Sequence, residues 1–283
     1  MKNILITGIT GTLGTAVARK LLNKGYTVTG ISRDEQKQKQ FRYKNDVRLV
    51  IGDVSNEESI LRAAKGADLI FHFAAMKCID ICQSNVQESY RSNVIGTNNV
   101  MKAASVNGSK VAFTSTDKAA EPKNTYGVCK ALAEKMVLSY GTGNVVCRYG
   151  NVLGSRGSVL NIFKKAILEH NEIRLTHADM TRFWITKDIA ADFVIDSAFS
   201  KEGLCIPDIK SSYVFTLAKI VANYLNKKPE LKIIGMHEAE KLHECLCIDS
   251  ETKAGKNIYS NDKDFLMTDE AVKEMIYKYM GHL

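Results

Sequence analysis

The segment NILITGITGTLG, residues 3–14, decides the fold of this chain. Asn3 to Thr7 is an apolar run that predicts a β-strand, and a helical pattern follows from about Thr12 to Asn23. Between them lies the glycine spacing G-x-x-G-x-x-G, which lets the pyrophosphate of a dinucleotide approach the backbone at the positive N-terminus of a helix. The alternative is a glycine-rich turn without a ligand. The strand and helix placed directly on either side favour the dinucleotide site.

The alternation of strands and helices continues along the chain. Further apolar runs predict strands at residues 26–32, 47–51, 68–73, 111–113 and 145–149. This pattern predicts an α/β fold with a doubly wound parallel sheet of the Rossmann type, whose ligands lie at the carboxyl ends of the strands. We expect a dinucleotide-binding domain over residues 1–150, completed by about 183–206, and a smaller C-terminal substrate-binding lobe over 151–182 and 207–283.

The composition narrows the class of protein. The 283 residues are 45% hydrophobic and 25% charged, which is ordinary for a globular protein. The sequence has no apolar run of about 18 residues and no signal-peptide pattern, so we expect a cytoplasmic protein without a membrane partner. Seven scattered cysteines fit a reducing compartment. The net charge of +8 has no basic block and equally suits a pyrophosphate-bearing substrate, so we expect no nucleic-acid partner.

Chemistry-bearing side chains gather after the fifth predicted strand. The strand end delivers Thr116, Asp117 and Lys118, and the following helix places Tyr126 and Lys130 one turn apart on one face. A lysine there favours the phenolate of a tyrosine, whose ordinary pKa of ~10 is too high for a base near neutral pH. Tyr-x-x-x-Lys alone is a weak signal, but an acid–base pair beginning nine residues before the tyrosine strengthens it. We predict that these five residues are catalytic.

The second strand ends at residues that select the cofactor. Asp34 alone would favour the bare ribose of NAD, whereas the adjacent Arg33 accommodates the 2′-phosphate of NADP, so we predict NADP and keep NAD possible. After the third strand, Asp53 can contact adenine or cap a helix. The predicted cofactor-binding residues are Gly8, Thr10, Gly11, Thr12, Leu13, Gly14, Ser32, Arg33, Asp34, Asp53, Val54, Ala74, Ala75, Lys77, Asn93, Tyr126 and Lys130.

Some polar residues keep two interpretations. Asn93 lies within a helix predicted over 86–107, where a polar side chain serves either a structural contact or the active site. Lys77 can reach cofactor, substrate or water. The segment 237–247, which contains Cys245-x-Cys247, is predicted to be helical, and a helix would point these two thiols apart. Because a second paired cysteine motif is also missing, we expect no metal site.

Together these motifs resemble the extended short-chain dehydrogenase/reductase superfamily over nearly the whole chain. Within it the chain is similar to nucleotide-sugar dehydratases of bacterial surface-polysaccharide synthesis, and in particular to the inverting UDP-N-acetylglucosamine 4,6-dehydratases that include those beginning pseudaminic acid synthesis. The motifs that carry the resemblance are STDKA (115–119), YGVCK (126–130), RYGNV (148–152), GSRGSV (154–159), MTRF (180–183) and EKLHE (240–244).

The resemblance implies roles for individual residues. Lys118 directly after Asp117 implies the inverting type, because the retaining type has Asp-Glu there. Tyr126 and Lys130 would be the oxidising pair, Thr116 would hold the sugar 4-hydroxyl, and the Asp-Lys pair would remove water. The substrate-binding residues that we predict are Met76, Lys77, Asn151, Ser158, Val159, Arg182 and Glu240, with Arg182 and Glu240 on the UDP part.

The expected activity is therefore that of a nucleotide-sugar 4,6-dehydratase. It would act on UDP-N-acetylglucosamine with inversion at C5, through transient oxidation of C4 by bound NADP. Two alternatives stay open, namely a UDP-hexosamine 4-epimerase of the same superfamily and a non-catalytic NADP-sensing module. Because many relatives form dimers or larger rings, we also expect a homo-oligomer.

Overall fold

The computed structural model describes residues 1–251 and 257–281 and contains two compact units. The first unit comprises residues 1–148 and 188–206, and the second comprises residues 149–187 and the chain from Pro207 onward. The boundaries predicted from the sequence differ from these by a few residues. No helix in the described part of the chain is both long and apolar enough to cross a membrane.

The first unit is built on a parallel sheet of seven strands in the order β10-β6-β5-β4-β1-β2-β3. The strands are β1 (Asn3–Thr7), β2 (Thr27–Ser32), β3 (Val47–Ile51), β4 (Leu69–His72), β5 (Lys110–Thr116), β6 (Val145–Tyr149) and β10 (Gly203–Cys205). The strand order reverses between β1 and β4, which pair directly in parallel, and such a reversal is the switch point where doubly wound sheets bind ligands. The predicted fold class is confirmed.

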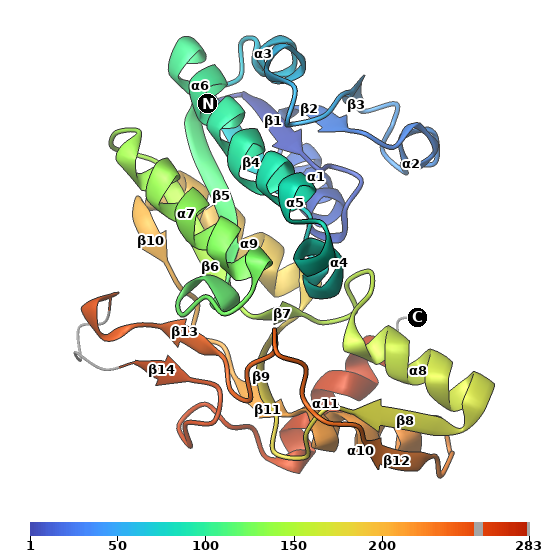
Figure 1. Cartoon of the computed structure of the whole chain (residues 1–283). Helices are drawn as coiled ribbons and strands as arrows, with labels where there is room; N and C mark the ends of the chain where they lie inside the picture. The colour runs from blue at the N-terminus through green and yellow to red at the C-terminus, as the bar shows by residue number, and fades with distance from the viewer. Residues whose placement is uncertain (252–256, 282–283) are drawn as a thin grey trace. The chain divides into compact units, whose positions relative to one another are not determined.

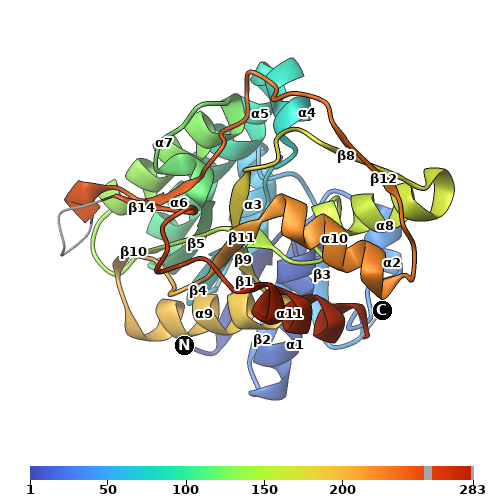
Figure 2. The same cartoon turned by 90° about the horizontal axis from the view of Figure 1, so that it is seen from below.

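Helices cover both faces of this sheet (Figure 1). Helices α3 (Glu57–Ala64), α6 (Gly96–Asn107) and α7 (Thr125–Ser139) pack on one face. Helices α1 (Thr12–Asn23) and α9 (Lys187–Ser200) lie on the opposite face, as Figure 2 shows from below. Ion pairs join these two helices, Arg19 to Asp188 at 2.7 Å and Lys20 to Asp192 at 2.8 Å. The short helix α2 (Glu35–Lys39) follows β2.

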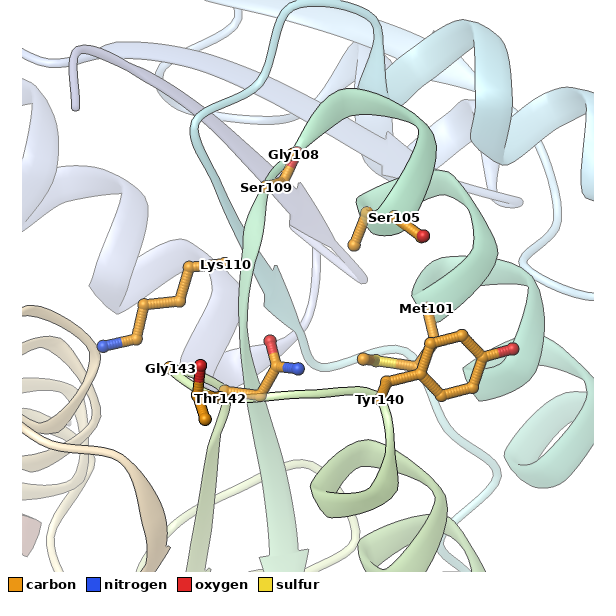
Figure 3. A pocket seen from close by; sticks show the side chains of 10 residues that line it. Met101, Ser105, Gly108, Ser109, Lys110, Tyr140, Thr142 and Gly143 are labelled. Atoms are coloured by element: carbon orange, nitrogen blue, oxygen red, sulfur yellow. The ribbon is translucent and has the colours of Figure 1, made fainter.

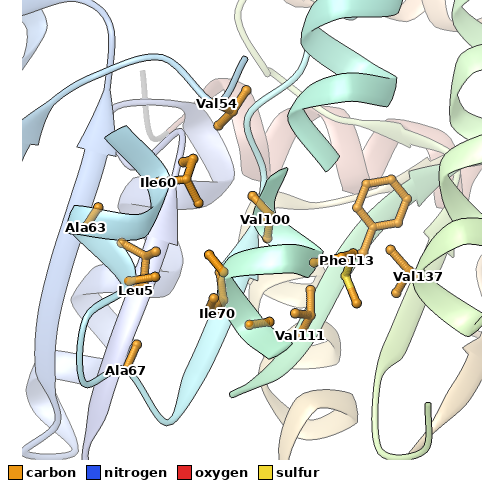
Figure 4. Packing of buried hydrophobic residues seen from close by; sticks show 14 of the residues in the cluster. Leu5, Val54, Ile60, Ala63, Ala67, Ile70, Val100, Val111, Phe113 and Val137 are labelled. Carbon is orange, nitrogen blue, oxygen red and sulfur yellow. The ribbon is translucent and has the colours of Figure 1, made fainter. Parts of the chain in front are cut away.

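The core under α3, α6 and α7 is formed by alternate residues of the strands and one stripe of each helix (Figure 4). Val111 and Phe113, two apart on β5, both point into this layer, where they meet Val100 of α6 and Val137 of α7. Full burial of such a side chain is worth about 1.5–3 kcal/mol. This packing fixes β5 and α7 against each other, and these are the elements that carry the predicted catalytic residues.

The predicted helix over 86–107 is present but interrupted. After α4 (Ile79–Ser84) come α5 (Val86–Tyr90), a π-helical turn η1 (Arg91–Ile95) and α6. Asn93 lies inside that wider turn with its side chain buried. Insertions of this kind in helices are frequent at functional sites.

The second unit has short sheets around its own core. Strands β11 (Ser211–Tyr213), β9 (Thr181–Ile185) and β7 (Asn151–Val152) form one sheet, β12 (Glu230–Ile233) pairs with β8 (Glu172–Leu175), and β13 (Cys245–Cys247) pairs with β14 (Ile258–Tyr259). Helices α8 (Val159–His170), α10 (Val214–Tyr224) and α11 (Asp269–Met280) bury Phe163, Leu217 and Ile276 among the side chains of one apolar cluster.

The predicted helix over 237–247 is wrong. Residues 237–244 form turns and loops, and β13 then pairs antiparallel with β14. Cys245, Leu246 and Cys247 are all buried, so tertiary pairing outweighed the local helical pattern. The argument that a helix separates the two thiols fails with it, because these cysteines lie on a strand whose pairing with β14 is irregular between them. Among the described residues, no group of three or more His, Cys, Asp or Glu side chains is arranged to hold a metal ion.

Candidate active site

The predicted acid–base pair lies at the end of β5. The strand stops at Thr116 and continues into a 3-10 turn, η2 (Asp117–Ala119). Asp117 is fully buried, and its Oδ1 accepts hydrogen bonds from Thr116 Oγ1 at 2.9 Å and from Lys118 Nζ at 2.9 Å. Lys118 is itself buried. The structure therefore brings a carboxylate and an amine together, away from water, at the carboxyl end of a central strand.

The next helix places Tyr126 beside this turn. Asn124 caps α7 by accepting a hydrogen bond from the Gly127 N–H at 2.9 Å. A Cβ on Gly127 would lie 2.4 Å from the Lys118 carbonyl oxygen, so only glycine lets α7 approach η2 this closely. Thr116 forms a side-chain hydrogen bond with Tyr126. Asn124 and Gly127 were not predicted as site residues, although the asparagine before a helical run was a visible capping signal.

The surroundings of Tyr126 act on its ionisation. Burial raises the pKa of its hydroxyl above the ordinary value, and the negative charge of Asp117 raises that pKa further. The Thr116 hydrogen bond acts in the opposite direction but does not offset them. In this structure burial and the neighbouring carboxylate favour the neutral phenol, and the role of Lys130 in favouring the phenolate stays a prediction.

Lys130 lies on the buried face of α7. Its Nζ is 4.0 Å from the centroid of the Phe113 ring, and burial lowers its pKa to about 7, although Glu134 raises it. Glu134 forms a buried bidentate pair with Arg148 of β6, with Nε–Oε1 at 2.9 Å and Nη2–Oε2 at 2.6 Å. Lys130 can thus release or take a proton near neutral pH. The Glu134–Arg148 pair was not predicted, because no local spacing connects the two residues.

The glycine-rich turn is held tightly in place. Gly8 has φ +67°, and a Cβ there would lie 2.9 Å from the Ala74 nitrogen. A Cβ on Gly14 would lie 2.5 Å from the Gly8 carbonyl oxygen. Helix α1, which includes Thr12 and Leu13 of this turn, begins at Gly11 without a side-chain cap or an acidic residue in its first turn. An N-terminus of this kind, without a capping side chain or a carboxylate, is suited to a pyrophosphate.

The predicted ribose-binding residues contact one another. Arg33 Nη1 lies 3.3 Å from Asp53 Oδ2, and more than half of the Arg33 side chain is exposed. Asp34 caps α2 by accepting from the Lys37 N–H at 2.9 Å. Asp53 Oδ1 accepts a hydrogen bond from the Ser55 N–H at 2.8 Å. Val54, which lies between these two residues in the sequence, is buried. Ser32, at the end of β2, accepts from Gln38. The carboxylates of Asp34 and Asp53 thus both make contacts within the protein, while the guanidinium of Arg33 lies at the surface.

Asn93 supports the loop that follows β4. Its Oδ1 accepts from the Met76 N–H at 2.8 Å, and its Nδ2 donates to the Met76 carbonyl at 2.9 Å. On the other side of the loop, the Ala74 N–H donates to Thr7 Oγ1 at 3.1 Å. Asn93 therefore fixes the backbone of a loop that contains Ala74, Ala75 and Lys77, and its amide is occupied by that structural task.

The predicted substrate residues of the second unit lie on adjacent elements. The Arg182 guanidinium donates to the carbonyls of Thr181, Lys241 and Leu242 at 2.7–3.1 Å, so it supports the segment that contains Glu240. Asn151 of β7 pairs with Trp184 of β9, two residues from Arg182. Ser158 precedes α8 as its cap residue without a side-chain capping bond, and Val159 starts that helix.

A hollow of about 230 Å³ lies at the opposite, amino-terminal edge of the sheet (Figure 3). Met101, Ser105 and Gly108 line it from the end of α6, Lys110 from the start of β5, and Tyr140 from the end of α7. None of the predicted site residues lines this hollow, so we do not assign the chemistry to it.

The fold and the site define the class of this protein. A glycine-rich turn follows β1 of a doubly wound sheet, and a helix carrying Tyr-x-x-x-Lys follows the β5 end with its buried acid–base pair. This is the organisation of the extended short-chain dehydrogenases/reductases, as the resemblance indicated. The chain belongs to the family described as "Polysaccharide biosynthesis protein", whose model matches residues 4–262.

Two kinds of relative are similar to this chain. The inverting UDP-N-acetylglucosamine 4,6-dehydratase of Campylobacter jejuni (strain 81-176) is 36% identical over 95% of this chain and 85% of the relative. The UDP-glucose 4-epimerase of Rickettsia bellii (strain RML369-C) is 34% identical over 91% of this chain and 81% of the relative. Sequence similarity alone therefore does not separate dehydratase from epimerase.

Solved structures agree with the fold. Pen from Bacillus thuringiensis superposes with a TM-score of 0.91 at 28% identity, covering 99% of this chain and 98% of that chain. The UDP-glucose 4-epimerase of Thermus thermophilus in complex with NAD superposes with a TM-score of 0.81 at 21% identity, covering 99% of this chain and 100% of that chain.

Proposed function

We propose that the protein is a nucleotide-sugar 4,6-dehydratase that acts on UDP-N-acetylglucosamine and inverts C5. The observation that carries this proposal is the buried Asp117–Lys118 pair at 2.9 Å beside Tyr126. An enzyme that only moves hydride to and from C4 needs the tyrosine, whereas loss of water from C5 and C6 also needs a base and an acid. The inverting dehydratase among the relatives supports this reading.

The residues of the first unit fit a nicotinamide dinucleotide. Gly8 and Gly14 leave room at an uncapped helix N-terminus, which suits a pyrophosphate. When bound, such a cofactor accepts a hydride from the sugar and later returns it. The exposed Arg33 favours NADP, because its guanidinium can pair with a 2′-phosphate. NAD stays possible, and the ratio of the dissociation constants of the two cofactors tests the choice.

The ion pair supplies both the acid and the base in one step. Transfer of a proton from Lys118 Nζ to Asp117 Oδ1, across a 2.9 Å hydrogen bond, gives a neutral amine and a neutral carboxylic acid without changing the net charge. The same transfer removes the carboxylate charge that raises the pKa of Tyr126. Tyr126, as the phenolate, then takes the proton from the sugar C4 hydroxyl.

The remaining steps follow from the C4 ketone. The ketone acidifies the C5 hydrogen, and Lys118 takes it as a proton while Asp117 gives its proton to the departing C6 hydroxyl, which leaves as water. Hydride then returns to C6, and a proton from solvent reaches C5 from the opposite face. The product is a 4-keto-6-deoxy sugar with C5 inverted. Thr116 holds the C4 oxygen, and the second unit holds UDP through Arg182 and Glu240.

The further substrate contacts and the setting of the enzyme are part of the same proposal. The sequence-based assignments of Asn151, Ser158 and Val159, and of Met76 and Lys77, as residues that bind the sugar nucleotide belong to this proposal. All seven cysteines are free thiols, which fits the cytoplasm. Val128 and Leu132, one turn apart on α7, are exposed and favour a homo-oligomer.

The test is incubation of the purified protein and NADP with UDP-N-acetylglucosamine, followed by mass detection. The proposal predicts a nucleotide sugar lighter by one water. UDP-galactose and UDP-glucose are the comparison substrates. Catalysis with no loss of water from any of them would reject a dehydratase.

The second candidate is a UDP-hexosamine 4-epimerase. The Rickettsia bellii relative favours it, and it would use Tyr126 and Lys130 but return hydride to C4. Its product has the same mass as the substrate and carries no solvent-derived hydrogen at C5. A non-catalytic sensor is the third, and cofactor binding without turnover of any UDP-hexosamine would support it.

A further inference from the structure

His72, the last residue of β4, is a buried titratable residue that the proposed chemistry does not use. Only 1% of it is exposed. Its Nδ1 lies 2.7 Å from Thr7 Oγ1 of β1, and its Nε2 lies 3.1 Å from Thr97 Oγ1 of α6. The ring therefore bridges the strand that leads into the glycine-rich turn and the helix that follows the π-helical turn.

The hydrogen bonds around the ring allow one consistent set of proton positions. The Thr97 hydroxyl donates its single proton to the Asn93 carbonyl at 2.7 Å, so toward the ring it can only accept, and Nε2 must carry the proton. Nδ1 then accepts from the Thr7 hydroxyl. The Thr7 oxygen accepts in turn from the N–H groups of Phe73 and Ala74, each at 3.1 Å.

The electrostatic surroundings keep the ring neutral. Burial, together with the smaller effect of the positive charge of Lys130, lowers the pKa of His72 to about 3. Phe113, whose ring centroid lies 5.5 Å from that of His72, adds an apolar wall. A neutral ring is what the hydrogen-bond directions require, because a protonated Nδ1 would face the donor hydroxyl of Thr7 without an acceptor.

The hydrogen bonds of His72 lead to the two segments that we assign to the cofactor, the glycine-rich turn and the loop that follows β4. Thr7 directly precedes Gly8, where an added Cβ would lie 2.9 Å from the Ala74 nitrogen. Thr97 contacts Asn93, whose amide holds the Met76 backbone from the other side. We propose that His72, as a neutral imidazole protonated on Nε2, is a positioning residue that holds the loop Phe73–Met76 against the glycine-rich turn and thereby sets the affinity for the dinucleotide. The affinity part of this inference rests on the proposed function.

The tautomer can be measured without any ligand. In protein labelled with ¹⁵N-histidine, one of the six imidazoles should have a protonated Nε2 and an unprotonated Nδ1 at all values between about pH 5 and 8. Loss of that signal in His72→Gln assigns it. A ring protonated on Nδ1, or one that titrates within this interval, would overturn the proposed geometry.

The affinity for the cofactor tests whether His72 positions the loop. His72→Phe keeps a buried ring but leaves both threonines without their partner, so we expect the dissociation constant of NADPH to rise about tenfold. The KM for the sugar nucleotide at saturating cofactor should stay within about twofold. His72→Gln, which keeps a donor and an acceptor, should recover part of the affinity, and Thr97→Val should resemble His72→Phe.

Thr114→Val is the matched control. This buried threonine of β5 donates to the His72 carbonyl at 3.3 Å but does not contact the ring, so the NADPH dissociation constant should not change. Equal losses of cofactor affinity in Thr114→Val and His72→Phe would show a general packing effect and overturn the positioning role, as would an unchanged NADPH affinity in His72→Phe. If the wild type turns over no UDP-sugar, the proposed function fails while the tautomer and binding results still decide the role of His72.

Discussion

At the scale of single residues, burial and a neighbouring carboxylate at the end of β5 both act on the ionisation of Tyr126, and burial has the larger effect. The Asp117 carboxylate raises the pKa of Tyr126. The amine of Lys118, 2.9 Å from Asp117 Oδ1, can neutralise this carboxylate by giving it one proton. The sequence revealed these three residues, because all lie in short motifs. It did not reveal His72 or the Glu134–Arg148 pair as connected groups, because their partners are distant in the chain and come together only in the folded protein.

Tyr126→Phe tests the base in the oxidation step. Without the phenol, hydride release from the sugar C4 should slow by about 10²–10⁴-fold, which is the usual contribution of a general base. The rate is compared at saturating NADP, which separates lost chemistry from lost binding. Single-turnover formation of reduced nicotinamide measures the step. A rate close to that of the wild type would remove Tyr126 from the mechanism.

Asp117→Asn tests the electrostatic coupling. Removing the carboxylate charge lowers the pKa of Tyr126, so the acid limb of the pH profile for C4 oxidation should move to lower pH. Water loss should nevertheless stop, because asparagine cannot donate the proton to the leaving hydroxyl. The measurement is the single-turnover rate at several pH values. An acid limb that stays in place or moves upward contradicts the coupling.

Lys130 gives a prediction on stability. Burial lowers its pKa from 10.5 to about 7, so between these values the unfolded state binds more protons than the folded state. The free energy of unfolding therefore gains a contribution that rises as the pH increases from about 7 to 10.5. Urea unfolding of the wild type and Lys130→Met across this interval should show a smaller rise in the variant. Parallel curves would mean that Lys130 is not desolvated in solution.

At the scale of elements, the site exists because α7 approaches η2 without a side chain between them. The sequence predicted α1 and β1 with their observed ends, because the glycines and the apolar periodicity coincide there. It missed the π-helical turn η1, in which Asn93 makes buried hydrogen bonds, and it placed a helix where β13 pairs with β14. Local patterns thus located the regular elements, and tertiary contacts decided the exceptions.

Gly127→Ala tests the close approach of α7. The added Cβ would lie 2.4 Å from the Lys118 carbonyl oxygen, so the helix must move away from η2. We expect a loss of about 1–3 kcal/mol in the free energy of unfolding and a fall in kcat of at least about tenfold. Lys135→Ala, exposed on the same helix, is the control and should change neither. Wild-type turnover in Gly127→Ala would show that the contact is not required.

At the scale of the whole molecule, a doubly wound sheet unit and a second unit with its own core make up the chain. The fold class followed from the regular alternation of strands and helices, and the similar solved structures agree with it. The sequence also pointed to an oligomer without locating the interface. The exposed apolar side chains of Val128 and Leu132 on α7 now identify a surface that can be tested.

Replacement of both Val128 and Leu132 by lysine should weaken self-association. Charges on this surface would have to be desolvated on assembly, so the double variant should sediment as a smaller species than the wild type at the same concentration. Sedimentation velocity measures the difference, and Ile162→Lys, exposed on α8 of the second unit, is the control. A wild type that sediments as a monomer at all concentrations would contradict the expected oligomer.

The central claim is that Lys118 removes the C5 proton after C4 has been oxidised. Its most direct test is the NMR spectrum of the product formed from UDP-N-acetylglucosamine in deuterated water, for the wild type and for Lys118→Ala. The wild type should give a 4-keto-6-deoxy sugar with deuterium at an inverted C5, and Lys118→Ala should give none while still binding the cofactor. A product that keeps its original C5 hydrogen, or an undiminished yield from Lys118→Ala, would contradict the claim.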